Sequence, residues 1–211
     1  MQTNESPATS RPAVAGAAST PRLTRADLMS LETYARERDA FRARVLAHKR
    51  LRNLAVGPHT TWCFEDRLTV QYQVQEMLRA ERIFEADAIQ EELDSYNPLI
   101  PDGTNFKATL LIEYSNAEER RVALAELKGI ERRCWVAIGG ERVFAIADED
   151  LERENEEKTS AVHFLRFELP AGARAAANAG APIELGIDHP AYRHSATLSA
   201  ESARSLAGDL A

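Results

Sequence analysis

The chain has 211 residues, of which 44% are hydrophobic, and it carries a formal net charge of −7 with a sequence pI of about 5.4. A chain of this length and apolar content can form one domain with a substantial buried core. The acidic balance argues against a protein that binds nucleic acid or an anionic membrane, because both functions need a basic face. The sequence contains no run of about 20 apolar residues, so it predicts no membrane-spanning segment.

The N-terminal residues and the cysteines indicate the compartment. Residues 1–22 are rich in Ala, Ser, Thr and Pro and lack the basic start and apolar stretch of a signal peptide, so they predict a disordered tail. Cys63 and Cys134 match no metal-binding spacing. Two thiols in a chain without a signal sequence are typical of a reduced, cytoplasmic protein, and a disulfide between them is the alternative.

A first helix is predicted from Thr24 to about Arg50. Thr24 can cap this helix, because Asp27 stands three residues further on as in a capping box. Apolar residues then keep helical spacing along the segment. A hairpin follows, with a strand and turn over 54–59 and a return strand over 60–65.

The segment 66–83 predicts the helix around which the chain is organised. At about 100° per residue, Val70 and Val74 fall on one arc, and Leu68 and Tyr72 fall on the opposite arc. Two opposed apolar stripes indicate a helix that is covered on both sides.

The rest of the chain predicts short strands that come as neighbours or hairpins, separated by short helices. Helices are expected over 85–96, 116–128 and 170–180, and strands over 108–114, 134–138, 142–146, 159–169 and 183–187. The very acidic segment 148–157 predicts a short helix or loop. The fold class is therefore α+β, with N-terminal helices packed against a mostly antiparallel sheet. We expect a single domain over 23–193 and a flexible C-terminal tail over 194–211.

The helix over 66–83 also carries the first candidate ligand-binding residues. Glu81 lies within the valine arc and Arg79 lies on the opposite arc, and a buried charge is costly unless it is paired. These two residues could hold a ligand, form structural ion pairs, or extend to the surface at the helix end. The polar residues around them form either a pocket wall or a solvated edge. The candidate ligand-binding residues are Gln75, Glu76, Arg79, Glu81, Arg82, Lys158 and His163.

His163 is the most informative histidine. The alternation of strand 159–169 places it on an apolar face, so we expect it to be buried. If Glu81 or Glu76 faces His163, the pair could bind a metal or move a proton, whereas a core histidine with satisfied hydrogen bonds is the alternative.

Glu81, His163 and His189 form a tentative metal-ligand set, with iron or zinc as the expected metal. His189 stands at a strand end, where a capped turn before Pro190 is the alternative. The sequence contains no glycine-rich phosphate loop, Gly-x-Ser-x-Gly, His-Glu-x-x-His or Glu-x-x-His. These absences count against the common enzyme classes, and whether the protein is an enzyme stays open.

Two long strings stand out: EDRLTVQYQVQEMLRAERIFEADAIQEELDSYNPLIPDGTNFKATLLIEY (65–114) and ADEDLERENEEKTSAVHFLRFEL (147–169). Together with LTRADLMSLETYARERDAFRARVLAHKR (23–50) and LGIDHPAYR (185–193), they resemble a bacterial family catalogued as domain of unknown function 3501. The resemblance covers about 23–193. It implies a bacterial cytoplasmic protein, and it supplies no established activity and no catalytic residues. Genes of this family often lie beside those of a rubrerythrin-like protein and an iron–sulfur oxidoreductase, so the resemblance also implies a partner in peroxide or redox metabolism.

Three functions are therefore open. The first is a non-catalytic accessory protein of a redox system, which docks a partner or delivers a ligand. The second is a small metal-binding protein or enzyme, with a site built from Glu76 or Glu81, Arg79 and His163. The third is a structural or ligand-sensing module.

Overall fold

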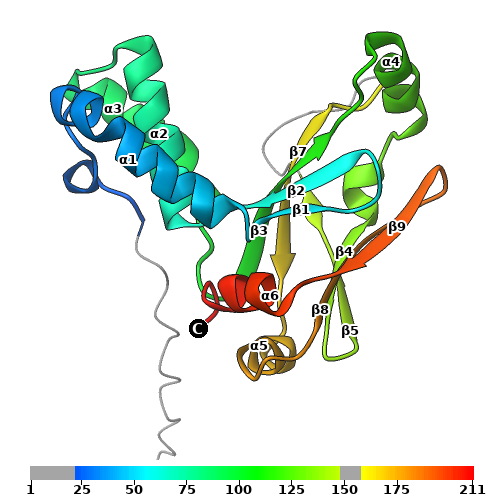
Figure 1. The fold of residues 1–211 in the computed structure, drawn as a ribbon. Coiled ribbons are helices and arrows are strands. Elements are labelled where there is room, and N and C mark those ends of the chain that lie inside the picture. The colour runs from blue at the N-terminus through cyan, green and yellow to red at the C-terminus, as the bar shows by residue number, and fades with distance from the viewer. Residues whose placement is uncertain (1–21, 148–157) are drawn as a thin grey trace, which may run out of the picture.

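The computed structural model describes residues 22–147 and 158–211. In these residues, helices and two antiparallel sheets form the α+β fold that the sequence predicts. Helices α1, α2 and α3 form a helical arm that leans away from the body, which consists of the two sheets and helices α4, α5 and α6 (Figure 1). The helices are α1 (Leu31–Lys49), α2 (Arg67–Glu81), α3 (Ala86–Tyr96), α4 (Ala117–Glu126), α5 (Ala171–Asn178) and α6 (Ala200–Ala207). The strands are β1 (Asn53–Ala55), β2 (Thr60–Phe64), β3 (Asn105–Ile112), β4 (Cys134–Ile138), β5 (Glu141–Phe144), β6 (Ile146–Ala147), β7 (Val162–Glu168), β8 (Ile183–His189) and β9 (Tyr192–Thr197).

The body is built on one apolar core that both sheets share. The five-stranded sheet has the order β1-β2-β3-β7-β6, and the four-stranded sheet has the order β5-β4-β8-β9. Alternate side chains along each strand point into the core, including Trp62, Leu110 and Phe167 from the first sheet and Val136 and Leu185 from the second. The opposite side chains of β3 and β7 therefore form the outer face of the five-stranded sheet.

The hairpin between β4 and β5 turns at Gly139-Gly140, as the sequence predicts. Both glycines have positive φ, 60° and 86°, which a two-residue hairpin turn of this kind requires. The chain then leaves this sheet and pairs β6 with β7 of the other sheet. The segment β5–β6 therefore joins the edges of the two sheets.

Helix α2 lies in the middle of the arm, and the prediction that it is covered on both sides is confirmed. Val70 and Val74 pack with Leu93 of α3, whereas Leu68 and Tyr72 join the apolar cluster of α1. Helix α2 begins after Asp66, whose side chain accepts a hydrogen bond from the Thr69 backbone N–H at 2.9 Å.

The first helix is shorter than predicted. Thr24 and Asp27 do form a capping box, but it caps a separate 3₁₀ turn over Arg25–Asp27. The long helix α1 begins only at Leu31, where Ser30 provides a second cap. Two caps close together in the sequence therefore start two elements instead of one.

The expectation of a flexible C-terminal tail over 194–211 is wrong. Strand β9 continues to Thr197, Ser199 then caps α6, and Leu206 of α6 is fully buried in the core of the body. The last residues are also held, because the backbone N–H of Ala211 donates to the carbonyl oxygen of Gly103 at 2.9 Å.

Two predicted segments, the N-terminal tail up to residue 21 and the acidic segment 148–157, lie outside the described residues. Within 22–147 and 158–211, no helix combines the length and the apolar character that crossing a bilayer requires.

Candidate functional site

A groove of about 840 Å³ separates the helical arm from the outer face of the five-stranded sheet. Its arm side comes from the end of α2, from α3 and from the 3₁₀ turn Asn97–Leu99, and its sheet side comes from β3, β6 and β7. The apolar and aromatic side chains that line it are Met77, Tyr96, Leu99, Ile146 and Phe164. A concave site with apolar walls and a few polar groups is the usual form of a binding pocket.

Glu65 is the most buried charged residue of this groove, and sequence reasoning missed it. It follows β2 directly and is only 3% exposed. Its carboxylate accepts hydrogen bonds from the hydroxyls of Thr69 (2.6 Å) and Thr109 (3.0 Å) and from the side-chain amide of Gln73 (3.0 Å). Three neutral donors therefore hold a buried carboxylate at the base of the groove.

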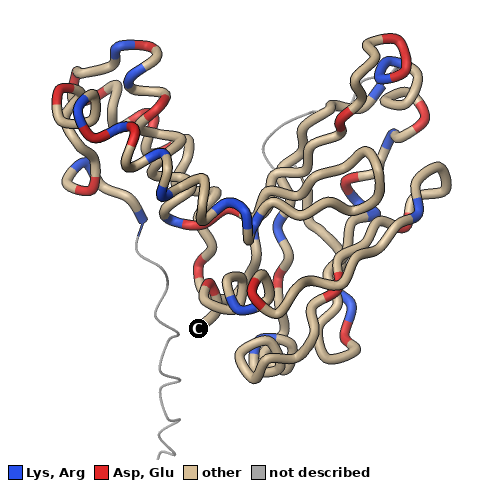
Figure 2. Tube along the Cα trace, viewed as in Figure 1, with Lys and Arg blue, Asp and Glu red and all other residues tan. Residues whose placement is uncertain are grey.

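The arm side of the groove is acidic. The segment 83–106, which contains α3, has no Lys or Arg, and Figure 2 shows that charged residues crowd on the arm while the sheets carry few. Burial, followed by the nearby charges of Glu81 and Glu91, raises the pKa of Glu92. Within the described part of the chain, neither Glu81 nor Glu92 forms an ion pair.

The sheet side of the groove carries two cations, Lys107 on β3 and Arg166 on β7. Lys107 is half-buried, and its ammonium donates to the carbonyl oxygen of Pro98 at 2.5 Å. Burial lowers the pKa of Lys107, which the negative charge of Asp102 partly offsets. Arg166 pairs with Glu168 on the same strand. The groove thus has an acidic arm side and a basic sheet side.

A buried charge cluster centred on Arg52 lies beside Glu65. Arg52 is 1% exposed and donates to the carbonyl oxygens of Phe64 (3.1 Å), Glu65 (3.1 Å) and Ser205 (3.0 Å). Since Ser205 belongs to α6, one side chain ties the end of β2 to a helix more than a hundred residues away in the sequence.

Three further side chains complete the Arg52 cluster. Arg52 forms an ion pair with Asp209, and its Nε lies 3.5 Å from Oδ2 of Asp66, which also contacts His48 Nε2 at 2.5 Å. Burial raises the pKa of Asp209 to about 6, against the opposing charge of Arg52. Burial also acts to raise the pKa of Asp66, but the charge of Arg52 and the Thr69 N–H together lower it. We interpret this cluster as the structural joint between the arm, the sheet and the C-terminus.

Gln75 and Glu76, two of the predicted ligand-binding residues, contact other parts of the arm. The fully buried amide of Gln75 accepts from the Met29 N–H at 2.8 Å and donates to the Met29 carbonyl oxygen at 3.2 Å. Glu76 binds Arg38 through two hydrogen bonds of 2.7 and 2.6 Å and accepts from the Tyr34 hydroxyl at 2.6 Å. The bonds to Arg38 lower the pKa of Glu76 to about 2.

The expectation that Arg79 and Glu81 lie on covered arcs is wrong. Both are exposed in the last turn of α2, which ends at Glu81. Arg82, also exposed, has the left-handed backbone conformation that ends the helix. Of these three residues, only Glu81 reaches the groove, at its rim.

The structure does not bring the predicted metal ligands together. His163 is buried, as predicted, and its Nε2 lies 3.0 Å from both the Thr159 hydroxyl and the Ser160 carbonyl oxygen. It shares the inward face of β7 with Leu165, whereas Glu81 lies on the other side of that sheet, in the groove with Phe164.

The third predicted ligand, His189, is buried, and its Nε2 lies 3.0 Å from the carbonyl oxygen of Lys128. Lys158 is exposed where the chain approaches β7. Across 22–147 and 158–211, no three His, Cys, Asp or Glu side chains are grouped to hold a metal ion. Iron or zinc binding stays a prediction.

Both cysteines are free thiols in separate places. Burial raises the pKa of Cys63, on the outer face of β2, to about 11, and it raises the pKa of the fully buried Cys134 in the core. A raised pKa keeps a thiol protonated at neutral pH and therefore weakly nucleophilic.

Comparisons with known proteins agree with this architecture. A family model described as "Protein of unknown function (DUF3501)" matches residues 22–210. A crystal structure of a novel protein of unknown function from Burkholderia pseudomallei K96243 is 53% identical, with a TM-score of 0.86, and the match covers 90% of this chain and all of that chain. A search of curated proteins found no match.

Proposed function

Since the chain belongs to the family described as "Protein of unknown function (DUF3501)", whose description assigns no activity, we propose from the geometry that it is a non-catalytic accessory protein that docks a partner protein in the groove between α3 and the five-stranded sheet. The observation that carries this proposal is the groove itself, which is large, is lined in part by apolar and aromatic side chains, and is acidic on its arm side.

The ionisable groups near the groove suit binding better than chemistry. Nucleophilic catalysis needs a nucleophile within hydrogen-bond reach of a base, and both thiols are protonated at neutral pH. His163 and His189 are engaged by backbone oxygens away from the groove. Glu65, which does line the groove, already accepts three hydrogen bonds from neutral groups.

The lining also indicates the chemistry of the partner. Ile146 faces the groove and is 41% exposed, so part of the apolar lining is open to solvent. Glu81 and Glu92 have no cationic partner among the described residues, so their carboxylates favour a Lys or Arg of the partner. A segment with a basic residue beside large apolar residues fits both features. The rubrerythrin-like protein and the iron–sulfur oxidoreductase that the family resemblance implies are the first candidate partners.

Binding of these two proteins, taken from the same organism and kept anaerobic and metal-replete, tests the proposal by calorimetry. We expect one of them to bind the full chain. We expect Ile146→Asp and Glu92→Lys each to raise the dissociation constant at least about tenfold. Val122→Asp is the matched control, because Val122 is similarly exposed, at 45%, on α4, away from the groove. Failure of both proteins to bind, or equal weakening by Val122→Asp, would contradict the proposal.

A further inference from the structure

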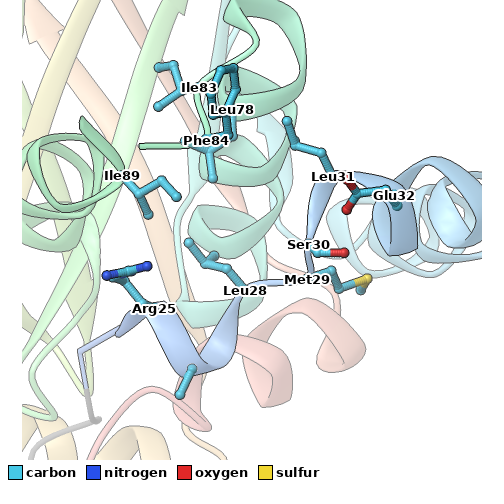
Figure 3. Close-up of a pocket in the computed structure, with 11 residues that line it drawn as sticks. Arg25, Leu28, Met29, Ser30, Leu31, Glu32, Leu78, Ile83, Phe84 and Ile89 are labelled. Atoms are coloured by element: carbon cyan, nitrogen blue, oxygen red, sulfur yellow. The ribbon is translucent and has the colours of Figure 1, made fainter. Parts of the chain in front are cut away.

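A second apolar pocket, of about 630 Å³, lies at the end of the arm where the start of α1, the end of α2 and the start of α3 meet. Figure 3 shows side chains from all three segments around the same opening. The apolar residues that line it are Leu28, Met29, Leu31, Leu78, Ile83, Phe84 and Ile89. This pocket contains no buried charged residue, unlike the groove.

Phe84 stands beside this pocket and is 70% exposed. Removing an aromatic side chain from water lowers the free energy of the system. An exposed Phe next to an apolar hollow is therefore a surface available for contact with another molecule. The preceding turn fixes this exposure. Arg82 has φ 57° and ψ 43°, and it is the only non-glycine residue with positive φ in the described ranges. This costly conformation ends α2. The next residue, Ile83, packs against the arm cluster, and Phe84 after it is left exposed.

The rim of the pocket carries one charge of each sign. Arg25 and Glu32 both line it, and neither forms an ion pair within the residues that the structure describes. A single patch therefore contains an aromatic knob, an apolar hollow, a cation and an anion.

We propose that this patch joins two copies of the chain across a two-fold axis, with Phe84 of each copy in the pocket of the other. A two-fold interface uses the same surface on both subunits, so the surface must be complementary to itself. A second copy supplies a Phe84 for the hollow and buries the Phe84 of the first. It also places Arg25 of one copy where Glu32 of the other can pair with it. A small apolar ligand would fill the hollow but leave Arg25 and Glu32 without partners, which is why a second copy fits better.

Sedimentation velocity of the full chain over a concentration series tests this proposal. We expect a monomer–dimer equilibrium, and we expect Phe84→Asp to raise its dissociation constant at least about a hundredfold, because two buried Phe contacts are lost per dimer. Phe144→Asp, at an exposed Phe of the body, is the matched control and should leave the equilibrium unchanged. Circular dichroism and thermal unfolding should show that both variants stay folded.

A charge exchange tests the orientation of the two copies. Arg25→Glu and Glu32→Arg should each weaken the dimer by roughly threefold or more, and the double variant should restore it, because the exchanged charges again face each other. A wild-type chain that is monomeric up to about 100 μM, or a dimer that Phe84→Asp leaves intact, would overturn the proposal.

Discussion

The body is stabilised by one continuous apolar core, whereas the helical arm has two small apolar clusters on either side of α2 and depends on directional polar contacts. In the arm, the Gln75 amide holds the backbone of Met29 through two hydrogen bonds, and Glu76 holds Arg38 through two more. Apolar packing is non-directional and depends on buried area, whereas a buried hydrogen bond fixes one geometry.

This difference affects the groove, because its arm side belongs to the helical arm and its sheet side belongs to the body. The sheet side rests on the body core, and its shape is fixed by strand pairing. The arm side is held through polar contacts and through the Arg52 cluster at the joint. We therefore expect the arm to open locally at a lower free energy than the sheets. Amide hydrogen exchange tests this, because the amides of α3 should then exchange faster than those of β3.

Substitution at the joint should have the largest effect. Arg52→Met leaves the largely buried Asp66 and Asp209 without the Arg52 guanidinium, so we expect the free energy of unfolding, measured by urea titration, to fall by about 3–5 kcal/mol. Arg42→Met, at an exposed position of α1, is the control. A loss below about 1 kcal/mol for Arg52→Met would mean that the cluster is not the joint.

The body should be intolerant of added volume at Gly186. A Cβ there would lie 2.1 Å from the Trp135 indole, because the two residues are paired across β4 and β8. We expect Gly186→Ala to lower the unfolding free energy by about 2–3 kcal/mol. Gly172→Ala in α5, where the nearest atom lies 4.0 Å away, should be neutral or slightly stabilising. Similar effects of the two substitutions would contradict tight packing in the body.

The arm should be sensitive to loss of a single amide. Gln75→Leu leaves the N–H and C=O of Met29 without their partner, at an expected cost of about 2 kcal/mol. The Met29 amide should also exchange with solvent faster, which a purely apolar packing defect would not cause locally. Gln90→Leu on the exposed side of α3 provides the control. Unchanged Met29 exchange would show that the amide does not position this segment.

The smallest effect should depend on pH. Because the pKa of Glu76 falls from 4.5 to about 2 on folding, its ionised form contributes stability above pH 4.5, and this contribution is lost as the pH falls toward 2. We expect Glu76→Gln to cost about 1 kcal/mol at pH 7, since the ion pair with Arg38 is partly exposed. The unfolding free energies of the two proteins should converge as the pH falls from 4.5 to 2. A difference that stays constant with pH would exclude the carboxylate charge as its cause.

Local patterns predicted much of the fold. The two stripes of α2, the turn at Gly139-Gly140 and the burial of His163 on β7 follow from helical and strand periodicity and from backbone conformations that neighbouring residues determine. The same reasoning missed β9 and α6, because their short, polar and alanine-rich segment has little apolar periodicity of its own. These elements become ordered through pairing with β8 and through the burial of Leu206.

The sites depended on contacts that periodicity cannot supply. The sequence alone identified the alternation of β7, but the alternation does not say which face of the sheet a helix covers. Only the tertiary structure placed His163 and Glu81 on opposite sides of that sheet and exposed Arg79 at a helix end. It also buried Glu65 and Arg52, whose partners come from β3 and α6. The physical reason is that the burial of a charge is decided by the partners that chain folding brings to it.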